Sequence, residues 1–177
     1  MTIIQNKKLI GFAAYSGTGK TTLIKEIVAI LNKSKLRVSV IKHAHHNFDV
    51  DQPGKDSYEI RKSGAENMLI SSNNRWALMH ENNYNNELKL KDLLNILNNV
   101  DSDIILVEGF KAEKFPKIEL YRDEIGKQKG LLCESDDNIV AVATDSDINI
   151  KNNIVVLDIN KPQEIADFII KFLNITK

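Results

Sequence analysis

The sequence predicts a three-layer α/β fold, in which a mostly parallel β-sheet lies between layers of helices. Three observations support this prediction. Several short runs are almost wholly apolar, which is typical of strands buried on both faces of a parallel sheet. A glycine-rich turn follows the first of these runs and leads into a helical pattern. Strand and helix patterns then alternate along most of the 177 residues, as they do in βαβ units.

The first βαβ unit has the clearest pattern. Residues 9–14 form a continuous apolar run, which predicts a buried strand. From Lys20 to Leu31 apolar residues recur at helical spacing, with charged residues between them. Residues 37–42 then predict a second strand. We expect the helix to connect the two strands by a right-handed crossover.

The rest of the chain continues the alternation, with one antiparallel interruption. Two short apolar runs flank the polar stretch 72–75, which predicts a β-hairpin inserted into the parallel fold. The remaining predictions are a helix over 56–63 closed by Gly64, hairpin strands at 68–71 and 76–80, a solvated loop at 82–86, a helix around 90–97, strands at 104–107, 117–121, 139–143 and 154–157, and a helix starting at Pro162.

Composition limits the class of protein. Apolar residues make up 42% and charged residues 27%, which is ordinary for a soluble globular domain, and residues 1–177 are predicted to form a single domain. The formal net charge is zero, so neither nucleic acid nor a membrane surface is an expected partner. With one cysteine, no signal-peptide pattern and no apolar run of membrane-spanning length, we expect a cytoplasmic protein.

The turn between the first strand and the first helix carries the strongest chemical signal. Glycines let backbone amides approach a phosphate chain, and the helix start adds further unpaired amides. Lys20 is expected to reach the phosphates and the Thr21 hydroxyl to bind Mg²⁺, which identifies a P-loop and predicts a P-loop NTPase fold. The strict motif is G-x-x-x-x-G-K-[ST], and Ala14 stands where its first glycine belongs. Alanine is tolerated at this position if its φ is negative. The expected phosphate-binding residues are Ser16, Gly17, Thr18, Gly19, Lys20, Thr21 and Thr22.

A carboxylate follows the apolar run at 104–107. We expect Glu108 to lie beside the end of the first strand, because acidic residues after such strands act near the Mg²⁺ of P-loop proteins. Glu108 and Lys20 are therefore the candidate catalytic residues, and Glu108 would either hold Mg²⁺ through water or, alternatively, orient an attacking water. The alternative is an ordinary exposed charge at a strand end.

The polar segment after the second strand is the third candidate. Its place at the carboxyl edge of the sheet, where open α/β proteins bind ligands, favours Lys42 and His43 as phosphate contacts and Asp49 and Asp51 as Mg²⁺ ligands. Two alternatives remain open. In the first alternative the segment is only a solvated polar loop. In the second its histidines and aspartates form a zinc site, although no second ligand pair with zinc-like spacing occurs elsewhere in the sequence.

Four separate segments together resemble one family, the molybdopterin-guanine dinucleotide biosynthesis protein B family. They are the P-loop, the run 40–57 with its His-His-x-Phe-Asp-x-Asp-x-Pro-Gly-Lys-Asp-Ser sequence, Val107-Glu108-Gly109-Phe110-Lys111, and Phe115-Pro116-Lys117-Ile118-Glu119. The resemblance runs from about Leu9 to Asp145. It implies GTP and Mg²⁺ binding, weak GTPase activity, a homodimer, and an accessory role beside the nucleotidyltransferase that attaches GMP to molybdopterin. In many GTP-binding relatives, an aspartate in the position of Asp145 accepts hydrogen bonds from guanine.

Three functions therefore compete. The first is a GTP-binding accessory protein that hydrolyses GTP slowly. The second is a P-loop kinase or ligase that phosphorylates a small molecule; outside the first βαβ unit only Arg61, Arg75 and Arg122 are available for the arginine-rich lid that such enzymes often use. The third is a module that binds nucleotide without hydrolysis and orders a loop for a partner.

Overall fold

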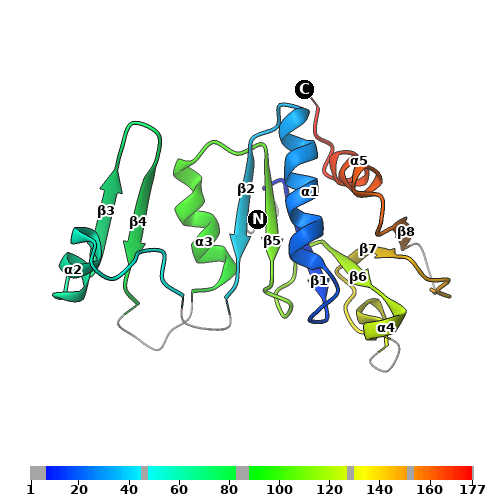
Figure 1. The fold of residues 1–177 in the computed structure, drawn as a ribbon. Helices are drawn as coiled ribbons and strands as arrows, with labels where there is room; N and C mark the ends of the chain where they lie inside the picture. Colours follow the sequence, from blue (N-terminus) through cyan, green and yellow to red (C-terminus); the bar gives the residue numbers. More distant parts are fainter. Residues whose placement is uncertain (1–6, 45–47, 83–87, 127–129, 151–153, 177) are drawn as a thin grey trace. The chain divides into compact units, whose positions relative to one another are not determined.

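The structure is a computed structural model that describes residues 7–44, 48–82, 88–126, 130–150 and 154–176 (Figure 1). By their contacts the residues form two compact units, one made of Met1–His43 with Leu90–Lys177 and the other of Ala44–Lys89. We call them the sheet unit and the hairpin unit. The expectation that residues 1–177 form a single domain stays a prediction.

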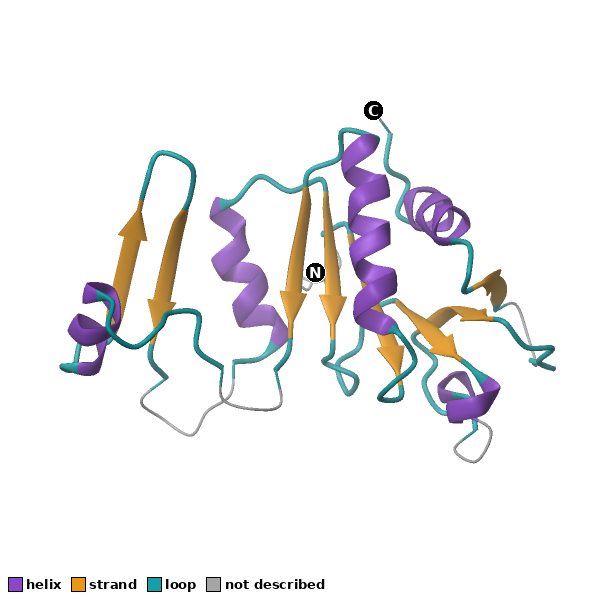
Figure 2. Ribbon diagram, viewed as in Figure 1, coloured by secondary structure: helices purple, strands orange, loops and turns teal. Residues whose placement is uncertain are grey.

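The sheet unit is built on six strands in the order β2-β5-β1-β6-β7-β8, and every neighbouring pair is parallel (Figure 2). The apolar runs of the sequence supply these strands, as predicted. Their bounds are Leu9–Ala14 for β1, Val38–Lys42 for β2, Ile104–Glu108 for β5, Lys117–Tyr121 for β6, Ile139–Thr144 for β7 and Val155–Asp158 for β8.

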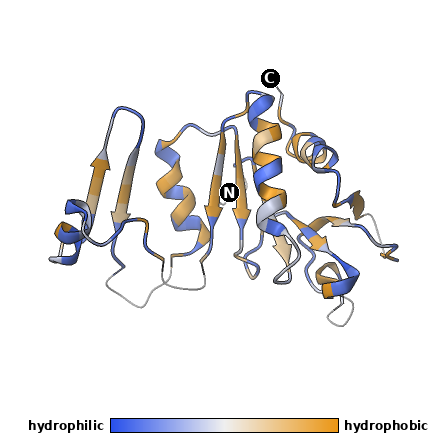
Figure 3. Ribbon diagram, in the orientation of Figure 1, coloured by the Kyte–Doolittle hydropathy of each residue, from blue (hydrophilic) through white to orange (hydrophobic). Residues whose placement is uncertain are grey.

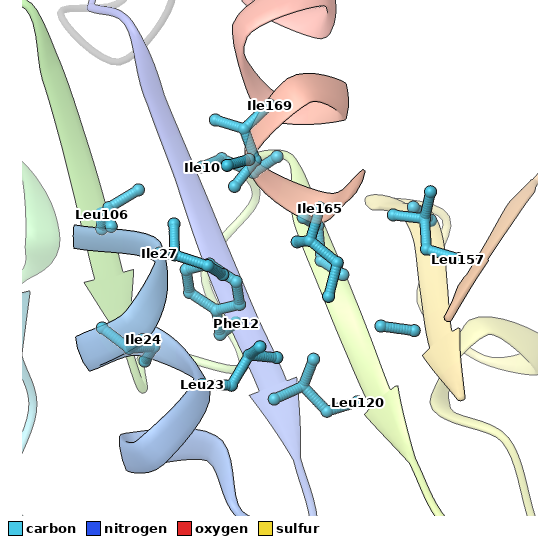
Figure 4. Close-up of a cluster of buried hydrophobic side chains, with 14 of the residues drawn as sticks. Ile10, Phe12, Leu23, Ile24, Ile27, Leu106, Leu120, Leu157, Ile165 and Ile169 are labelled. Atoms are coloured by element: carbon cyan, nitrogen blue, oxygen red, sulfur yellow. The ribbon is translucent and has the colours of Figure 1, made fainter. Parts of the chain in front are cut away.

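Helices cover both faces of this sheet, because alternate residues of a strand point to opposite faces. From β1, Ile10 and Phe12 pack in one core with α1 (Lys20–Lys33) and α5 (Pro162–Phe172), and Figure 4 shows this cluster. Leu9 packs on the other face with α3 (Leu90–Ile96). In Figure 3 the strands β2 and β5 are largely apolar, whereas α1 carries both apolar and hydrophilic residues. The predicted three-layer α/β fold is confirmed.

The hairpin unit contains the predicted helix and antiparallel hairpin. Helix α2 (Asp56–Lys62) ends before Gly64, as predicted. Gly64 has a φ of +113°, a backbone angle that glycine adopts readily after a helix. Strands β3 (Asn67–Ser71) and β4 (Trp76–His80) pair in antiparallel register, with Leu69 opposite Leu78. The amide of Ser72 donates to the carbonyl of Arg75 at 2.8 Å and closes the turn. Most of the predicted loop at 82–86 lies outside the described residues.

The long connection between β6 and β7 differs from the sequence reading, which found no element there. It contains the short helix α4 (Asp123–Gly126) and the 3₁₀ turn η3 (Leu132–Glu134). A second 3₁₀ turn, η2 (Leu97–Asn99), follows α3. The carboxylate of Glu119, in β6, is buried and accepts the amides of Leu132 at 2.7 Å and Cys133 at 2.9 Å. Burial raises the pKa of Glu119, although these two amides favour its charged form.

Within the described residues, no helix combines the length and apolarity that a membrane span requires.

Candidate functional site

The glycine-rich turn adopts a conformation that its sequence requires. Strand β1 ends at Ala14 and α1 begins at Lys20, so the turn comprises residues 15–19. Gly17 and Gly19 have φ values of +88° and +87°, in the left-handed region that L side chains rarely adopt. A Cβ at Gly19 would meet nothing within 4 Å, so glycine is needed there for its backbone angles and not for space inside the protein.

Thr18 and Ala14 fix the turn to the core. Thr18 is 3% exposed and its hydroxyl donates to the carbonyl of Tyr15 at 2.7 Å, which leaves the backbone amide as the group that Thr18 can offer a phosphate. Ala14 is 1% exposed at the end of β1, and it is not among the described non-glycine residues with positive φ. The negative φ needed for alanine in place of the motif's first glycine is therefore present.

The start of α1 offers positive potential to the turn. The first helical hydrogen bond is donated by the amide of Leu23 to the carbonyl of Gly19 at 3.1 Å, so the amides just before Leu23 have no intrahelical acceptor. No side chain caps this end, and its first turn carries no acidic residue. Aligned peptide dipoles make such a helix start attractive to anions. Ser16, Thr21 and Thr22 are exposed around it.

Three predicted residues converge on Glu108. In the parallel register Glu108 pairs with Phe12 of β1 and with Lys42 of β2, which brings three strand ends to one edge. The carboxylate lies 3.9 Å from Nζ of Lys20 and 3.4 Å from Nζ of Lys42, and its side chain is 13% exposed. The Thr21 hydroxyl lies 3.5 Å from Oε1. The start of α1, next to the glycine turn, thus has two ammonium groups, a hydroxyl and a carboxylate close to one another.

The oxygen donors at this point fit Mg²⁺. Magnesium binds hard oxygen ligands and usually takes one or two protein ligands beside phosphate and water. Thr21 and Glu108 supply a hydroxyl and a carboxylate within 3.5 Å of each other, next to the amides of the turn. Their chemistry therefore suits the predicted metal.

His43 lies against the backbone that follows Glu108. Its amide donates to the carbonyl of Glu108 at 2.8 Å, and its ring stacks on Phe110 with centroids 4.7 Å apart. A Cβ at Gly109 would lie 2.6 Å from Cβ of His43, and Gly109 has a φ of +101°. Sequence reasoning assigned no role to Gly109 or Phe110. A glycine directly after the carboxylate of a buried strand was the available signal.

Asp49 and Asp51 belong to the hairpin unit, where they contact other groups. Asp49 accepts from Nη2 of Arg61 at 2.5 Å and from the amide of Asp51 at 3.3 Å, and Nη1 of Arg61 donates to Glu81 at 2.5 Å. The hydrogen bond from Arg61 holds the pKa of Asp49 below its ordinary value. Their role as Mg²⁺ ligands stays a prediction.

The zinc reading involves the same segment. Within the described ranges, no three histidine, cysteine, aspartate or glutamate residues group as they would around a metal ion. His45 and His46 lie outside the described residues.

Asp145 follows β7 at the carboxyl edge of the same parallel sheet. It forms an ion pair with Arg122, which also donates to Oδ1 of Asn160 at 3.1 Å. The hydroxyl of Ser146 donates to the second carboxylate oxygen of Asp145 at 3.3 Å. This network fixes the carboxylate, and contact with a guanine base stays a prediction.

Comparisons with known proteins agree on one family. The model of the family described as molybdopterin guanine dinucleotide synthesis protein B matches residues 9–145. A molybdopterin-guanine dinucleotide biosynthesis adapter protein of Escherichia coli is 45% identical over 165 residues, which are 93% of each chain. A protein of the same description from Haemophilus influenzae is 41% identical over 94% of this chain and 89% of its own.

Solved structures show the same fold. The crystal structure of a MobB protein homolog from Bacillus stearothermophilus aligns with a TM-score of 0.71, 21% identity and coverage of 94% of this chain and 98% of its own. The structure of Bacillus subtilis MobB aligns with a TM-score of 0.71, 20% identity and coverage of 92% and 96%. At these identities the likeness supports the fold, a P-loop NTPase-like α/β arrangement. The family match and the two similar curated proteins together show that this chain belongs to the molybdopterin guanine dinucleotide synthesis protein B family.

Proposed function

We propose that this chain is a GTP-binding adapter protein in molybdopterin guanine dinucleotide synthesis, and that it hydrolyses GTP slowly with Mg²⁺. The observation that carries the proposal is the convergence of Lys20, Thr21 and Lys42 on Glu108 beside the start of α1, whose first amides have no intrahelical acceptor. The similar Escherichia coli and Haemophilus influenzae proteins are described as adapters in that synthesis. Its protein partner is the nucleotidyltransferase that attaches GMP to molybdopterin.

The residues divide the work of holding a nucleotide. The amides of residues 16–22 and the ammonium group of Lys20 bind the phosphate chain, and Lys42 and His43 flank it. Thr21 and Glu108 would hold Mg²⁺, which would supply positive charge beside the phosphates. Glu108 also accepts a hydrogen bond from the water that attacks the terminal phosphate. Asp145 accepts from the guanine N1 and N2 groups, which adenine lacks as donors.

Slow turnover is expected from what surrounds Glu108. An arginine beside a transferring phosphoryl group accelerates the reaction by roughly 10³ to 10⁵. Within the described part of the chain, no arginine forms an ion pair with Glu108, and Arg61 and Arg122 are engaged with other carboxylates. A site with lysines alone favours binding over rapid hydrolysis. The lack of an arginine at Glu108 among the described residues also weighs against a kinase or ligase. Rapid phosphorylation of a small acceptor by this protein would contradict the proposal.

Calorimetry with Mg²⁺ tests the nucleotide site. We expect GTP to bind much more tightly than ATP, and Lys20→Ala to remove most of the affinity. Lys25→Ala, an exposed lysine later in α1, removes the same charge and should leave binding unchanged. Equal affinities for GTP and ATP would refute the guanine assignment, and unchanged binding by Lys20→Ala would refute the phosphate site.

Hydrolysis is tested separately, by phosphate release. We expect turnover well below the common enzyme value of about 10 per second, and none in Lys20→Ala. If GTP binds but releases no phosphate, the protein is a module that binds nucleotide without hydrolysing it. Binding to the nucleotidyltransferase, measured with and without GTP, then decides whether nucleotide controls the adapter role.

A homodimer is part of the proposal, and the hairpin supports it. Leu69, Trp76 and Leu78 lie on one face of the hairpin and are 62%, 63% and 53% exposed. Isolated two-stranded hairpins are marginally stable, and contiguous exposed apolar side chains commonly mark an interface. A second copy of the chain would cover this face. Sedimentation should show a dimer that Leu78→Asp dissociates and Asn73→Asp, in the turn, does not. A monomeric parent protein would contradict the dimer.

A further inference from the structure

The connection between β5 and β6 crosses β1 close to the phosphate-binding turn. Val107 of β5 and Lys117 of β6 both pair with Gly11 of β1, so residues 109–116 leave and rejoin the sheet at the same level. Phe115 is 2% exposed and packs on Gly11, where a Cβ would lie 2.4 Å from its ring. The absence of a side chain at Gly11 therefore lets this loop lie flat on β1, just before the turn.

A buried lysine holds the middle of the loop. The Lys117 side chain is 2% exposed, and its Nζ donates to Asp136 at 2.6 Å and to the carbonyl of Lys111 at 3.0 Å. It also lies 5.2 Å from the centroid of the Phe115 ring. A buried ammonium group requires such partners, because burial without them is costly. The backbone of Lys111 is thus fixed from inside the protein.

The ammonium group of Lys111 lies near the side chain of the first residue of the phosphate-binding turn. Its Nζ lies 5.8 Å from the ring centroid of Tyr15, the first residue of that turn, and the residue is exposed. Lys20 and Lys42 lie beside Glu108, which follows directly on the strand that precedes this loop. Lys20 and Lys42 thus lie near Glu108 and Lys111 near Tyr15, and a phosphate chain on the turn would carry the charge that draws all three together.

We infer that Lys111 is a further phosphate-binding residue, which contacts the phosphate chain of the nucleotide held by the turn, and that Lys117 positions it. The inference rests on the proposed nucleotide site. It adds a ligand contact from the loop after Glu108, a segment to which the motif of the turn itself assigns no role. A cation–π contact with Tyr15 alone is the competing role for this lysine.

Titration with guanine ligands of different phosphate number tests Lys111. Lys111→Met keeps the length of the side chain and removes its charge. We expect about tenfold weaker GTP binding, as for the loss of one charge-assisted hydrogen bond, and a flatter dependence on salt concentration. Binding of guanosine, which has no phosphate, should not change. Lys111→Arg should retain affinity for GTP, and Lys114→Met, with the same charge change in the same loop, should behave as the parent.

The outcomes separate this inference from the proposed function. If the parent binds GTP and Lys20→Ala abolishes binding, but Lys111→Met binds GTP normally, the role of Lys111 is refuted and the phosphate site stands. Equal losses for GTP and guanosine would also refute it, because they would show a structural effect on the whole site. If the parent itself does not bind GTP, both proposals fall.

The positioning role of Lys117 is tested by a double-mutant cycle. Lys117→Met should weaken GTP binding in the parent and add no further loss in the Lys111→Met background, because the two residues then act through one contact. Additive losses would refute the coupling. Thermal melting by circular dichroism checks folding of each variant. Should Lys117→Met not fold, Asp136→Asn removes the partner of Lys117 instead and is read in the same cycle.

Discussion

The sheet unit and the hairpin unit differ in what surrounds their strands. Ile104, Leu106 and Val107 of β5 are inaccessible to solvent, and helices cover both faces of their sheet. In the hairpin unit, Leu69, Trp76 and Leu78 are more than half exposed, and a nearly buried Arg61 joins Asp49 and Glu81. Apolar burial stabilises the first unit, whereas ionic hydrogen bonds fix the second. The sheet unit therefore forms a packed frame for the proposed phosphate site, and the exposed face of the hairpin is where the proposed second copy would pack.

The largest effect is expected in the core of the sheet unit. Phe12 is 1% exposed and packs between β1 and α1 (Figure 4), so Phe12→Ala should lower the free energy of unfolding by about 3–5 kcal/mol. Urea denaturation followed by far-ultraviolet circular dichroism measures it. Ile96→Ala, at a residue 57% exposed, should change it by less than about 0.5 kcal/mol. Similar losses for both variants would remove the distinction between core and surface.

A smaller effect is expected where the frame meets the site. Gly109 has a φ of +101°, and a Cβ added there would lie 2.6 Å from the Cβ of His43. Gly109→Ala should therefore lower the free energy of unfolding by about 1–3 kcal/mol and weaken GTP binding. Gly130→Ala is the matched control. Its φ is +72°, but the added Cβ would come no nearer than 3.7 Å to Glu134. Gly109→Ala should therefore cost more than Gly130→Ala, and the reverse order would contradict the close approach of His43.

The smallest effect is expected in the hairpin unit, on acidification. Because Arg61 lowers the pKa of Asp49, the charged carboxylate stabilises the native unit above its ordinary pKa of 3.8, and this contribution is lost as the pH falls through the lowered native value. Trp76, the single tryptophan, lies in β4 and reports on this unit by fluorescence.

Asp49→Asn provides the comparison for that titration. It should loosen the hairpin unit already at neutral pH and reduce the further change in Trp76 fluorescence on acidification. Asp101→Asn, which removes a partner of Arg37 in the sheet unit, should leave the Trp76 signal as in the parent. An unaltered acid transition in Asp49→Asn would show that another group controls the hairpin unit.

Much of the fold was accessible from local pattern. The apolar runs predicted all six strands of the parallel sheet, and the polar stretch 72–75 predicted the hairpin turn. Parallel strands end at one edge, so the sequence also predicted that Lys42 and Glu108 lie at the same edge of the sheet. The connection between β6 and β7 was not predicted. Lys117 and Glu119 have an ordinary alternating pattern, and their burial depends on Asp136 and on the amides of η3.

The sequence alone determined the local conformations: the glycines at positive φ in the turn, the apolar strands and the amphipathic helices. These depend on residues close together in the chain, so pattern and sterics suffice. The tertiary structure decided which strand ends are neighbours, and with them that Lys20, Lys42 and Glu108 meet at one point and that Lys117 holds the loop of Lys111. Such contacts join segments far apart in sequence, and only the packing of the sheet selects among the possible pairings.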